Sequence, residues 1–184
     1  MTWSLPSEQS TLRGPRLELV PYVLEDAPWI ARLAGPIAVA RFTGLPHPMG
    51  EAGATAWIER HLDGTRNGVS FGWAARESGA PIGGGSIRLD AKTGAMSIGF
   101  WLGEASWGRG LGTELARLLA DHAFGDLDAR RVQADCVAEN TASARILEGL
   151  GLRPEGRQRG NFERDGRFHD VLLFGALADD PRPD

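Results

Sequence analysis

The chain has 184 residues, of which 42% are hydrophobic and 24% charged, and it carries a net charge of −4. These values predict one globular domain and argue against a nucleic-acid-binding surface, which is normally basic. Cys136 is the only cysteine, so an internal disulfide is excluded, and no segment has the roughly 20 apolar residues of a membrane span. The N-terminus lacks the apolar stretch of a signal peptide, and we therefore expect a cytoplasmic protein.

Hydrophobic periodicity and turn residues predict a strand, two helices, three strands, a helix, a strand, a helix and two strands. The expected ranges are 17–20, 27–34, 51–63, 70–76, 81–89, 95–102, 110–124, 131–138, 140–151, 152–160 and 168–176. Short turns between the three consecutive strands predict that they are antiparallel. This order is typical of an α/β protein with a mixed (α+β) sheet. We expect a domain over 12–177, after an N-terminal arm of residues 1–11 and before a disordered tail of residues 178–184.

A glycine-rich turn is the most informative segment of the chain. It runs from Trp107 to Gly112, between the strand expected at 95–102 and the amphipathic helix expected at 110–124. Glycines allow the backbone to approach a ligand closely, and the first turn of a helix leaves N–H groups free with a partial positive charge. Such a turn suits a phosphate or pyrophosphate. The sequence therefore predicts an anion-binding site here.

Other motifs lack the context that their chemistry requires. Gly108–Gly112 reads G-x-G-x-G rather than G-x-G-x-x-G, and no acidic residue ends the next strand as a dinucleotide site needs. Gly68–Gly72 matches the nucleophile elbow G-x-S-x-G, but a strand rather than a helix is expected after Ser70. The histidines are scattered and have no metal-ligand spacing, so no metal site is expected.

The glycine-rich turn also carries a family resemblance. Gly99–Leu102 followed by Trp107–Glu114 resembles the acyl-CoA-binding motif of the GNAT superfamily of N-acetyltransferases, and more narrowly its RimJ/RimL-like branch, named for ribosomal-protein N-terminal acetyltransferases. Further matches follow in the same order, at residues 14–19, 25–27, 82–83, 140–145, 150–152 and 165–171. The resemblance spans residues 12–176. It implies the GNAT acyl-CoA N-acyltransferase fold, a central, mostly antiparallel sheet flanked by helices.

The resemblance implies how acetyl-CoA is held as cosubstrate. Backbone groups of residues 100–102 pair with the pantetheine arm in a V-shaped opening, and the amides of residues 107–113 hold the pyrophosphate. Asn140 contacts pantetheine and also suits a helix cap, while Arg109 and Arg145 also suit solvated surface positions. The cofactor-binding residues implied are Phe100, Trp101, Leu102, Trp107, Gly108, Arg109, Gly110, Leu111, Gly112, Thr113, Asn140 and Arg145.

The implied reaction is direct attack of a neutral amine on the thioester carbonyl. Ser143 matches a serine that this branch places near the sulfur as an acid, and it equally suits a helix cap. Ser97 stands where relatives often carry an acidic base, so Glu163, near the position of an acid in some ribosomal enzymes, is the candidate base. Glu104 is a weaker candidate, and an amide near Leu102 is expected to polarise the carbonyl.

The acceptor implied is an amine of a protein N-terminus or of a small molecule. The aromatic candidates for lining its pocket are Trp29, Phe42, Trp57 and Phe162. Because no base is evident, a catalytically silent acyl-CoA-binding module is the alternative function. The resemblance leaves a homodimer open, and it implies no nucleic-acid or membrane partner.

Overall fold

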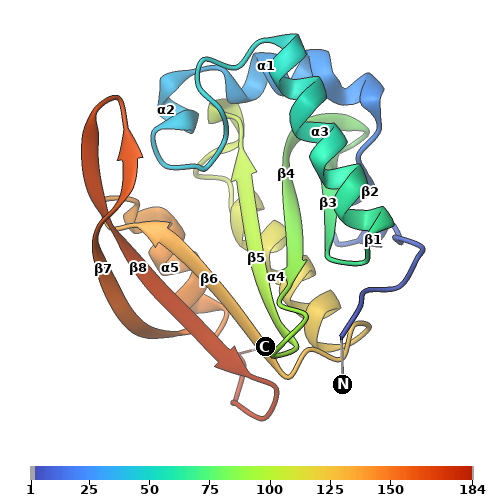
Figure 1. Ribbon diagram of the computed structural model, residues 1–184, viewed down its shortest axis with the longest axis vertical. Coiled ribbons are helices and arrows are strands. Elements are labelled where there is room, and N and C mark those ends of the chain that lie inside the picture. Colours follow the sequence, from blue (N-terminus) through green and yellow to red (C-terminus); the bar gives the residue numbers. More distant parts are fainter. Residues whose placement is uncertain (1–2, 184) are drawn as a thin grey trace.

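The computed structural model describes residues 3–183 and contains one eight-stranded sheet with helices on both faces (Figure 1). The strand order is β1-β2-β3-β4-β5-β6-β8-β7, and every neighbouring pair is antiparallel except β5 and β6. The strands are β1 Leu12–Arg13, β2 Leu17–Pro21, β3 Ser70–Glu77, β4 Ala80–Leu89, β5 Ala95–Leu102, β6 Arg131–Val137, β7 Arg153–Arg164 and β8 Arg167–Leu177. The helices are α1 Ala27–Ala34, α2 Ile37–Ala40, α3 Glu51–Arg66, α4 Leu111–Phe124 and α5 Thr141–Gly149.

This architecture confirms the expected mixed α/β class and the mostly antiparallel sheet. Two elements were not expected, the two-residue strand β1 and the four-residue helix α2. Neither is long enough to show a hydrophobic period, so the sequence carries no signal for them. Asp26 precedes α1, but its carboxylate does not cap the helix, because it accepts from the Val23 amide and the Trp29 indole and pairs with Arg76.

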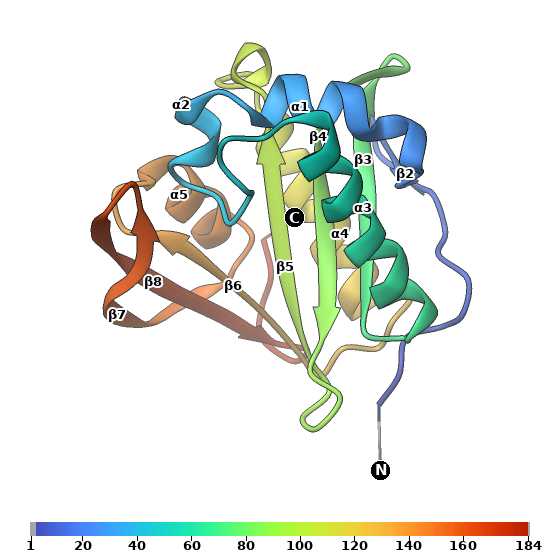
Figure 2. The same ribbon diagram turned by 45° about the horizontal axis from the view of Figure 1, so that its top comes forward.

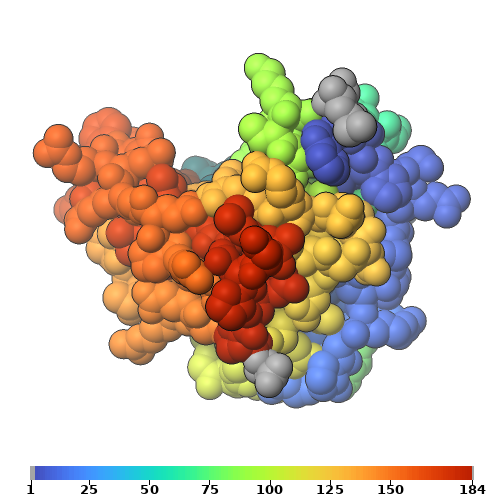
Figure 3. Space-filling model, turned by 90° about the horizontal axis from the view of Figure 1, so that it is seen from below, coloured from blue at the N-terminus to red at the C-terminus, as the bar shows by residue number. Residues whose placement is uncertain are grey.

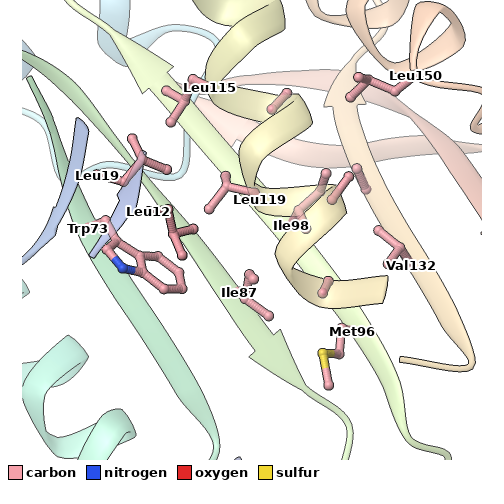
Figure 4. Close-up of a cluster of buried hydrophobic side chains, with 14 of the residues drawn as sticks. Leu12, Leu19, Trp73, Ile87, Met96, Ile98, Leu115, Leu119, Val132 and Leu150 are labelled. Carbon is pink, nitrogen blue, oxygen red and sulfur yellow. The ribbon is translucent and has the colours of Figure 1, made fainter. Parts of the chain in front are cut away.

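The helices divide between the two faces of the sheet (Figure 2). α1 and α3 cover one face, where Ile30 and Ile58 pack with Trp101 in a smaller core. α4 and α5 cover the other face and contribute to the larger core. In Figure 4, Leu115 and Leu119 of α4 lie over Ile87 and Ile98 of the sheet.

Gly85 of β4 allows this close packing on the α4 face. A Cβ at Gly85 would lie 2.7 Å from Cδ1 of Leu119, a distance that real Cβ atoms do not adopt. The same face also carries Val132 of β6, so α4 bridges strands on both sides of the β5–β6 boundary. The α4 helix therefore holds the two halves of the sheet together.

The two central strands, β5 and β6, separate soon after they meet. Their parallel pairing includes only Ala95–Ser97 and Arg131–Gln133, and the remaining residues of β5 have no partner on β6. Beyond that point β6 pairs only with β8, while β5 pairs only with β4. A sheet that splits in this way leaves one free strand edge on each side of the opening.

The segment expected to be an arm lies against the sheet along its described part, and residues 1–2 lie outside the described residues. Leu5 is buried, Gln9 Nε2 donates to Gly72 O at 2.7 Å, and the Trp73 indole donates to Ser10 O at 2.8 Å. At the other end, Arg117 donates to Pro183 O at 3.0 Å. In Figure 3 this C-terminal segment (dark red) lies on the body of the molecule beside the yellow-to-gold α4 region.

Asp184 of the expected disordered tail lies outside the described residues. Among the residues that are described, none of the helices has both the length and the apolar character required to cross a bilayer.

Candidate active site

A cavity of about 960 Å³ lies where β5 and β6 diverge. Its walls come from the glycine-rich turn and α5 on one side and from α2, α3 and the β7–β8 hairpin on the other. It is therefore open to both faces of the sheet, and groups that approach from opposite faces can meet in it.

The backbone of the glycine-rich turn presents a row of free N–H groups to this cavity. Gly108 and Gly110 have φ values of 71° and 77°, in the left-handed region that glycine tolerates best. The amides from Gly108 to Thr113 make no hydrogen bond within the described part of the chain, and Glu114 is the first to bond back, to Gly110 O. Free amides at a helix N-terminus form a binding site for an anionic group.

The Trp107 amide was expected to hold the pyrophosphate together with the amides that follow it. It donates to Glu104 O at 3.0 Å, so it is not available to an anion. The Trp107 indole donates to Leu102 O at 2.8 Å and so fixes the turn to the end of β5. Trp107 therefore shapes the site through its side chain.

Only alternate backbone groups of β5 face the opening. The Gly103 amide donates to Ile82 O on β4, and strand residues alternate, so Trp101 also directs its N–H and C=O toward β4. The expected pairing of the Trp101 backbone with pantetheine is therefore not possible. Phe100 and Leu102 direct theirs toward the opening, as does Ile98 with its carbonyl, whereas the Ile98 amide faces Gln133 in the last parallel pair and the Leu102 carbonyl is taken by the Trp107 indole. Strand alternation indicates Ile98, which the sequence analysis missed.

The remaining cofactor candidates divide into two groups. Thr113, Asn140 and Arg145 line the cavity, and Asn140 Oδ1 also accepts from the Ser143 amide at 3.1 Å as a helix cap. The side chain of Leu111 is fully buried in the core, so only its amide can reach a ligand. Arg109 is outside the cavity wall and pairs with Glu77 at 2.9 Å.

The catalytic candidates are not brought together. Ser143 lines the cavity, as expected. Glu163 is exposed outside the cavity wall, and its carboxylate accepts from the Gly166 amide at 2.6 Å in the β7–β8 turn. Glu104 is also exposed and outside the wall. The expectation that Glu163 is a base at the reacting centre is therefore not supported by its position.

Among the described residues, Asp135 of β6 is the one carboxylate in the cavity wall. Asp135 is exposed and lines the cavity. Burial among the cavity walls raises the pKa of Asp135, and the nearby charge of Arg88 counteracts part of that increase. The alternation of β6, with Val132, Ala134 and Cys136 on the core side, could have indicated that Asp135 faces the other way.

Cys136 contributes to the cavity wall but is a poor nucleophile. Burial, with smaller contributions from Asp135 and Glu148, raises the pKa of its thiol to about 11. The thiol is therefore protonated at neutral pH, which agrees with a reaction that needs no covalent enzyme intermediate.

Three of the four aromatic candidates for the acceptor pocket, Phe42, Trp57 and Phe162, line the cavity. Trp29 lies outside the wall and stacks on Trp101 with ring centroids 6.2 Å apart. Within residues 3–183 there is no group of three or more His, Cys, Asp or Glu side chains arranged to hold a metal ion.

A carboxylate that the sequence analysis missed fixes the glycine-rich turn to the N-terminal strand. Glu114 accepts from the amides of Arg16 and Leu17 at 2.7 and 2.9 Å and from Arg16 Nε at 2.8 Å. Arg16 also donates to Arg109 O in the turn at 2.9 Å. Desolvation alone would raise the pKa of Glu114, but these hydrogen bonds outweigh it and hold the pKa below its ordinary value.

We expect Glu114→Gln to lower the free energy of unfolding by about 2 kcal/mol at neutral pH, because it weakens charge-assisted hydrogen bonds to two backbone amides. Urea denaturation measures the change. Asp121→Asn, an exposed carboxylate without a hydrogen-bond partner in residues 3–183, is the matched control on the same helix. Because the folded-state pKa is lowered, the contribution of Glu114 should disappear as the pH falls through that pKa. Equal stabilities of the two variants would contradict this role.

Comparisons with known proteins show the family of the chain. A family model described as the acetyltransferase (GNAT) domain matches residues 16–153. The uncharacterized N-acetyltransferase p20 of Bacillus licheniformis is 29% identical over 170 residues, which cover 91% of this chain and 96% of that protein.

Two solved structures have the same fold. RimL, a ribosomal alpha-N-protein acetyltransferase in complex with coenzyme A, has a TM-score of 0.83 at 19% identity, covering 91% of this chain and 98% of that chain. RimJ of Mycobacterium smegmatis, in complex with CoA-disulfide, has a TM-score of 0.85 at 23% identity, covering 95% and 90%. The family match includes the free amides at α4 and the strand edge of β5. The chain thus belongs to the GNAT acetyltransferase family and is an acyl-CoA-dependent N-acetyltransferase.

Proposed function

We propose that the chain transfers an acetyl group from acetyl-CoA to the primary amine of a protein N-terminus or of a small molecule. The observation that carries this proposal is the row of free amides from Gly108 to Thr113, next to the free edge of β5. The amides offer donors to a pyrophosphate, and the backbone of Ile98 and Phe100 offers a strand edge to the amide groups of pantetheine.

The chemistry divides between the cosubstrate and the protein. Acetyl-CoA supplies an acyl group that is already activated as a thioester. The chain then has to orient the amine, stabilise the oxyanion and protonate the leaving sulfur. We assign the oxyanion to a free amide of β5, that of Leu102 or Phe100, and protonation of the leaving sulfur to the Ser143 hydroxyl, while the proton that the attacking nitrogen loses passes to water, from which the serine regains its own. This hydroxyl lies in the cavity wall and makes no hydrogen bond within residues 3–183.

The amine needs little help from a strong base if it is an α-amino group. Such a group has a pKa of about 7.7–8.0, whereas a lysine amine has a pKa of about 10.4. A substantial fraction of an α-amino acceptor is therefore neutral near pH 7.5. This agrees with the position of Glu163 outside the cavity wall.

Thiol release from acetyl-CoA tests the proposal, with a panel of peptide N-termini, amino acids and polyamines as acceptors. Amine-dependent release of CoA would support it, and a reaction without added amine is the control. Calorimetric binding of CoA with no thiol release on any acceptor would instead support the silent acyl-CoA-binding module.

We expect Ser143→Ala to lower kcat by about 100-fold with a small change in KM for acetyl-CoA. The substitution removes a general acid and leaves the free amides of the glycine-rich turn intact. The alanine keeps the backbone amide that Asn140 accepts from, so the helix cap is preserved. Thr141→Ala, an exposed position on the same turn of α5, is the matched control. An unchanged kcat for Ser143→Ala would assign the serine to the cap alone.

A further inference from the structure

A row of polar side chains crosses four strands on the face of the sheet that α3 covers. Strand register places Ser70 opposite Arg88, Arg88 opposite Ser97, and Ser97 opposite Gln133. Residues directly opposite each other share a face of the sheet, and Gln133 Nε2 donates to Ser97 Oγ at 3.1 Å, which confirms it here. Asp135 follows on the same face of β6, two residues beyond Gln133.

The next row on this face is formed by small residues and leaves space above Ser86 and Gly99, whereas His61 and Tyr22 cover Gly72. Gly72 is opposite Ser86, and Ser86 is opposite Gly99. Ser86 and Gly99 line the cavity, and a Cβ at Gly99 would meet only Ser86 Oγ, at 3.3 Å. The polar row therefore borders a part of the cavity whose base is formed by small residues of the sheet. This part lies on the side of the sheet away from α4.

α3 adds further charged and aromatic side chains above these small residues. Arg60 and His61 line the same cavity as Arg88 and Asp135, and Figure 2 shows α3 crossing this face of the sheet. Burial, with smaller contributions from the charges of Arg60 and Arg88, lowers the pKa of His61 to about 4. At neutral pH the α3 side of the cavity therefore holds the guanidinium groups of Arg60 and Arg88, a neutral imidazole and the acidic side chain of Asp135, whereas Arg145 lies on the α5 side.

None of the Arg60, Arg88 and Asp135 side chains, all of which are exposed, forms a direct ion pair with a neighbour in the described chain, although Arg88 lies close enough to Asp135 to lower its pKa. Arg60, Arg88 and Asp135 make no ion pair and no side-chain hydrogen bond with any residue between 3 and 183. A charge that loses water without gaining a partner is costly, so a bound acceptor has to satisfy the groups that it covers. An amine alone would satisfy Asp135 and leave both guanidinium groups uncovered.

We propose that the acceptor bears a carboxylate close to its amine, with Arg88 and Arg60 binding the carboxylate and Asp135 orienting the amine. This inference rests on the proposed function, because it assigns the acceptor of the same reaction. The planar guanidinium group matches a carboxylate with two parallel hydrogen bonds, which an amide or an amine cannot reproduce. Polyamines and aminoglycosides are disfavoured, since their extra positive charges would face two arginines.

Two kinds of acceptor share this chemistry, a free amino acid with its α-carboxylate and a peptide N-terminus followed by an acidic side chain. Matched pairs of acceptors separate them. Alanine against alaninamide tests the α-carboxylate, and Ser-Asp-Gly amide against Ser-Asn-Gly amide tests the side chain. In one of the two pairs we expect kcat/KM to be at least about 10-fold higher for the acceptor with the carboxylate. The pair that shows this difference identifies whether the chain recognises an α-carboxylate or an acidic side chain.

Variants connect that preference to the pocket. Arg88→Gln should lower kcat/KM for the carboxylate acceptor at least about 10-fold more than for its amide, because only the former loses a charge-assisted pair. Arg88→Glu should shift the preference toward a cationic acceptor such as Ser-Lys-Gly amide. Arg159→Gln, an exposed arginine of β7 outside the cavity wall, is the control and should keep the wild-type preference.

Asp135→Asn tests the amine end of the acceptor. It should raise KM for both members of a pair by a similar factor, since both carry the same amine. Equal use of carboxylate and amide acceptors by the wild type, or an equal loss on both in Arg88→Gln, would overturn the inference.

Calorimetry of the acceptors on the CoA-saturated chain separates this inference from the proposed function. Binding that depends on the carboxylate and on Arg88, without thiol release, would overturn the proposed acetyl transfer and support the recognition site. Thiol release without a carboxylate preference would support the transfer and overturn the site. The absence of both would overturn both.

Discussion

Gly108→Asp is expected to weaken CoA binding by about 100-fold, the largest loss that we expect from a single substitution in this chain. Gly108 has a φ of 71°, and a Cβ there would meet no atom within 4 Å, so the added carboxylate would extend into the space beside the free amides. A pyrophosphate at those amides would then face a like charge a few ångströms away. Isothermal calorimetry with CoA measures the loss, which should shrink as salt screens the repulsion.

Backbone strain does not account for this effect. Asp128 and Asp165 already adopt φ values of 51° and 52° in this chain, so aspartate tolerates the conformation. Gly79, with a φ of 82° and likewise no atom within 4 Å of an added Cβ, provides the matched control Gly79→Asp. Gly108→Asn adds the same shape without charge. If Gly108→Asp and Gly108→Asn lower the affinity equally, the repulsion is absent and the anion does not bind here.

His61 should make the chain lose stability in mild acid. Its pKa is lowered from 6.5 to about 4 in the folded state, chiefly by burial and further by Arg60 and Arg88. Between these two values the unfolded chain binds a proton that the folded chain does not, so the free energy of unfolding falls as the pH falls from 6.5 to about 4. Because the imidazole is only partly covered, we expect a loss of up to about 3 kcal/mol.

Urea denaturation between pH 7.5 and 4 measures this loss, and His61→Gln should reduce its size. Removing a neighbouring charge with Arg60→Gln should raise the pKa of His61 and therefore also flatten the profile. The imidazole packs against Trp57 and Tyr22, with ring centroids 4.2 and 5.6 Å away, so His61→Gln will also cost stability at neutral pH. The test is therefore the slope against pH, and parallel profiles for the wild type and His61→Gln would refute it.

The turn at Trp107–Gly112 could be predicted because its structure is local. Positive φ values at Gly108 and Gly110 and a helix beginning at Leu111 depend on the residue types at those positions. The amides that follow are free because a helix start always leaves them so. The sequence did not indicate which neighbours form hydrogen bonds with the remaining backbone groups around the turn. The hydrogen bond from the Trp107 amide to Glu104 and that from its indole to Leu102 depend on how the short 3-10 helix Glu104–Ser106, between β5 and the turn, folds back.

Glu163 shows why the base could not be assigned from sequence. β7 pairs with β8 through two irregularities, between Pro154 and Gly156 and between Gln158 and Phe162. Each such bulge inserts residues that have no partner and so changes which side chains face the site. The alternation of the sequence therefore cannot be carried through β7, and Glu163 lies near the end of β7, opposite Phe168 and outside the cavity wall.

The sequence by itself determined the class of fold, the order of nearly all elements and the glycine-rich turn with its free amides, because each depends on the periodicity or conformation of neighbouring residues. Only the tertiary structure decided the pocket that we propose for the acceptor. Arg60, Arg88 and Asp135 come from a helix and two strands distant in the chain, and they share a cavity because β5 pairs with β6 for only three residues before the strands diverge. Register and divergence arise from packing across the whole sheet, and no local pattern encodes them.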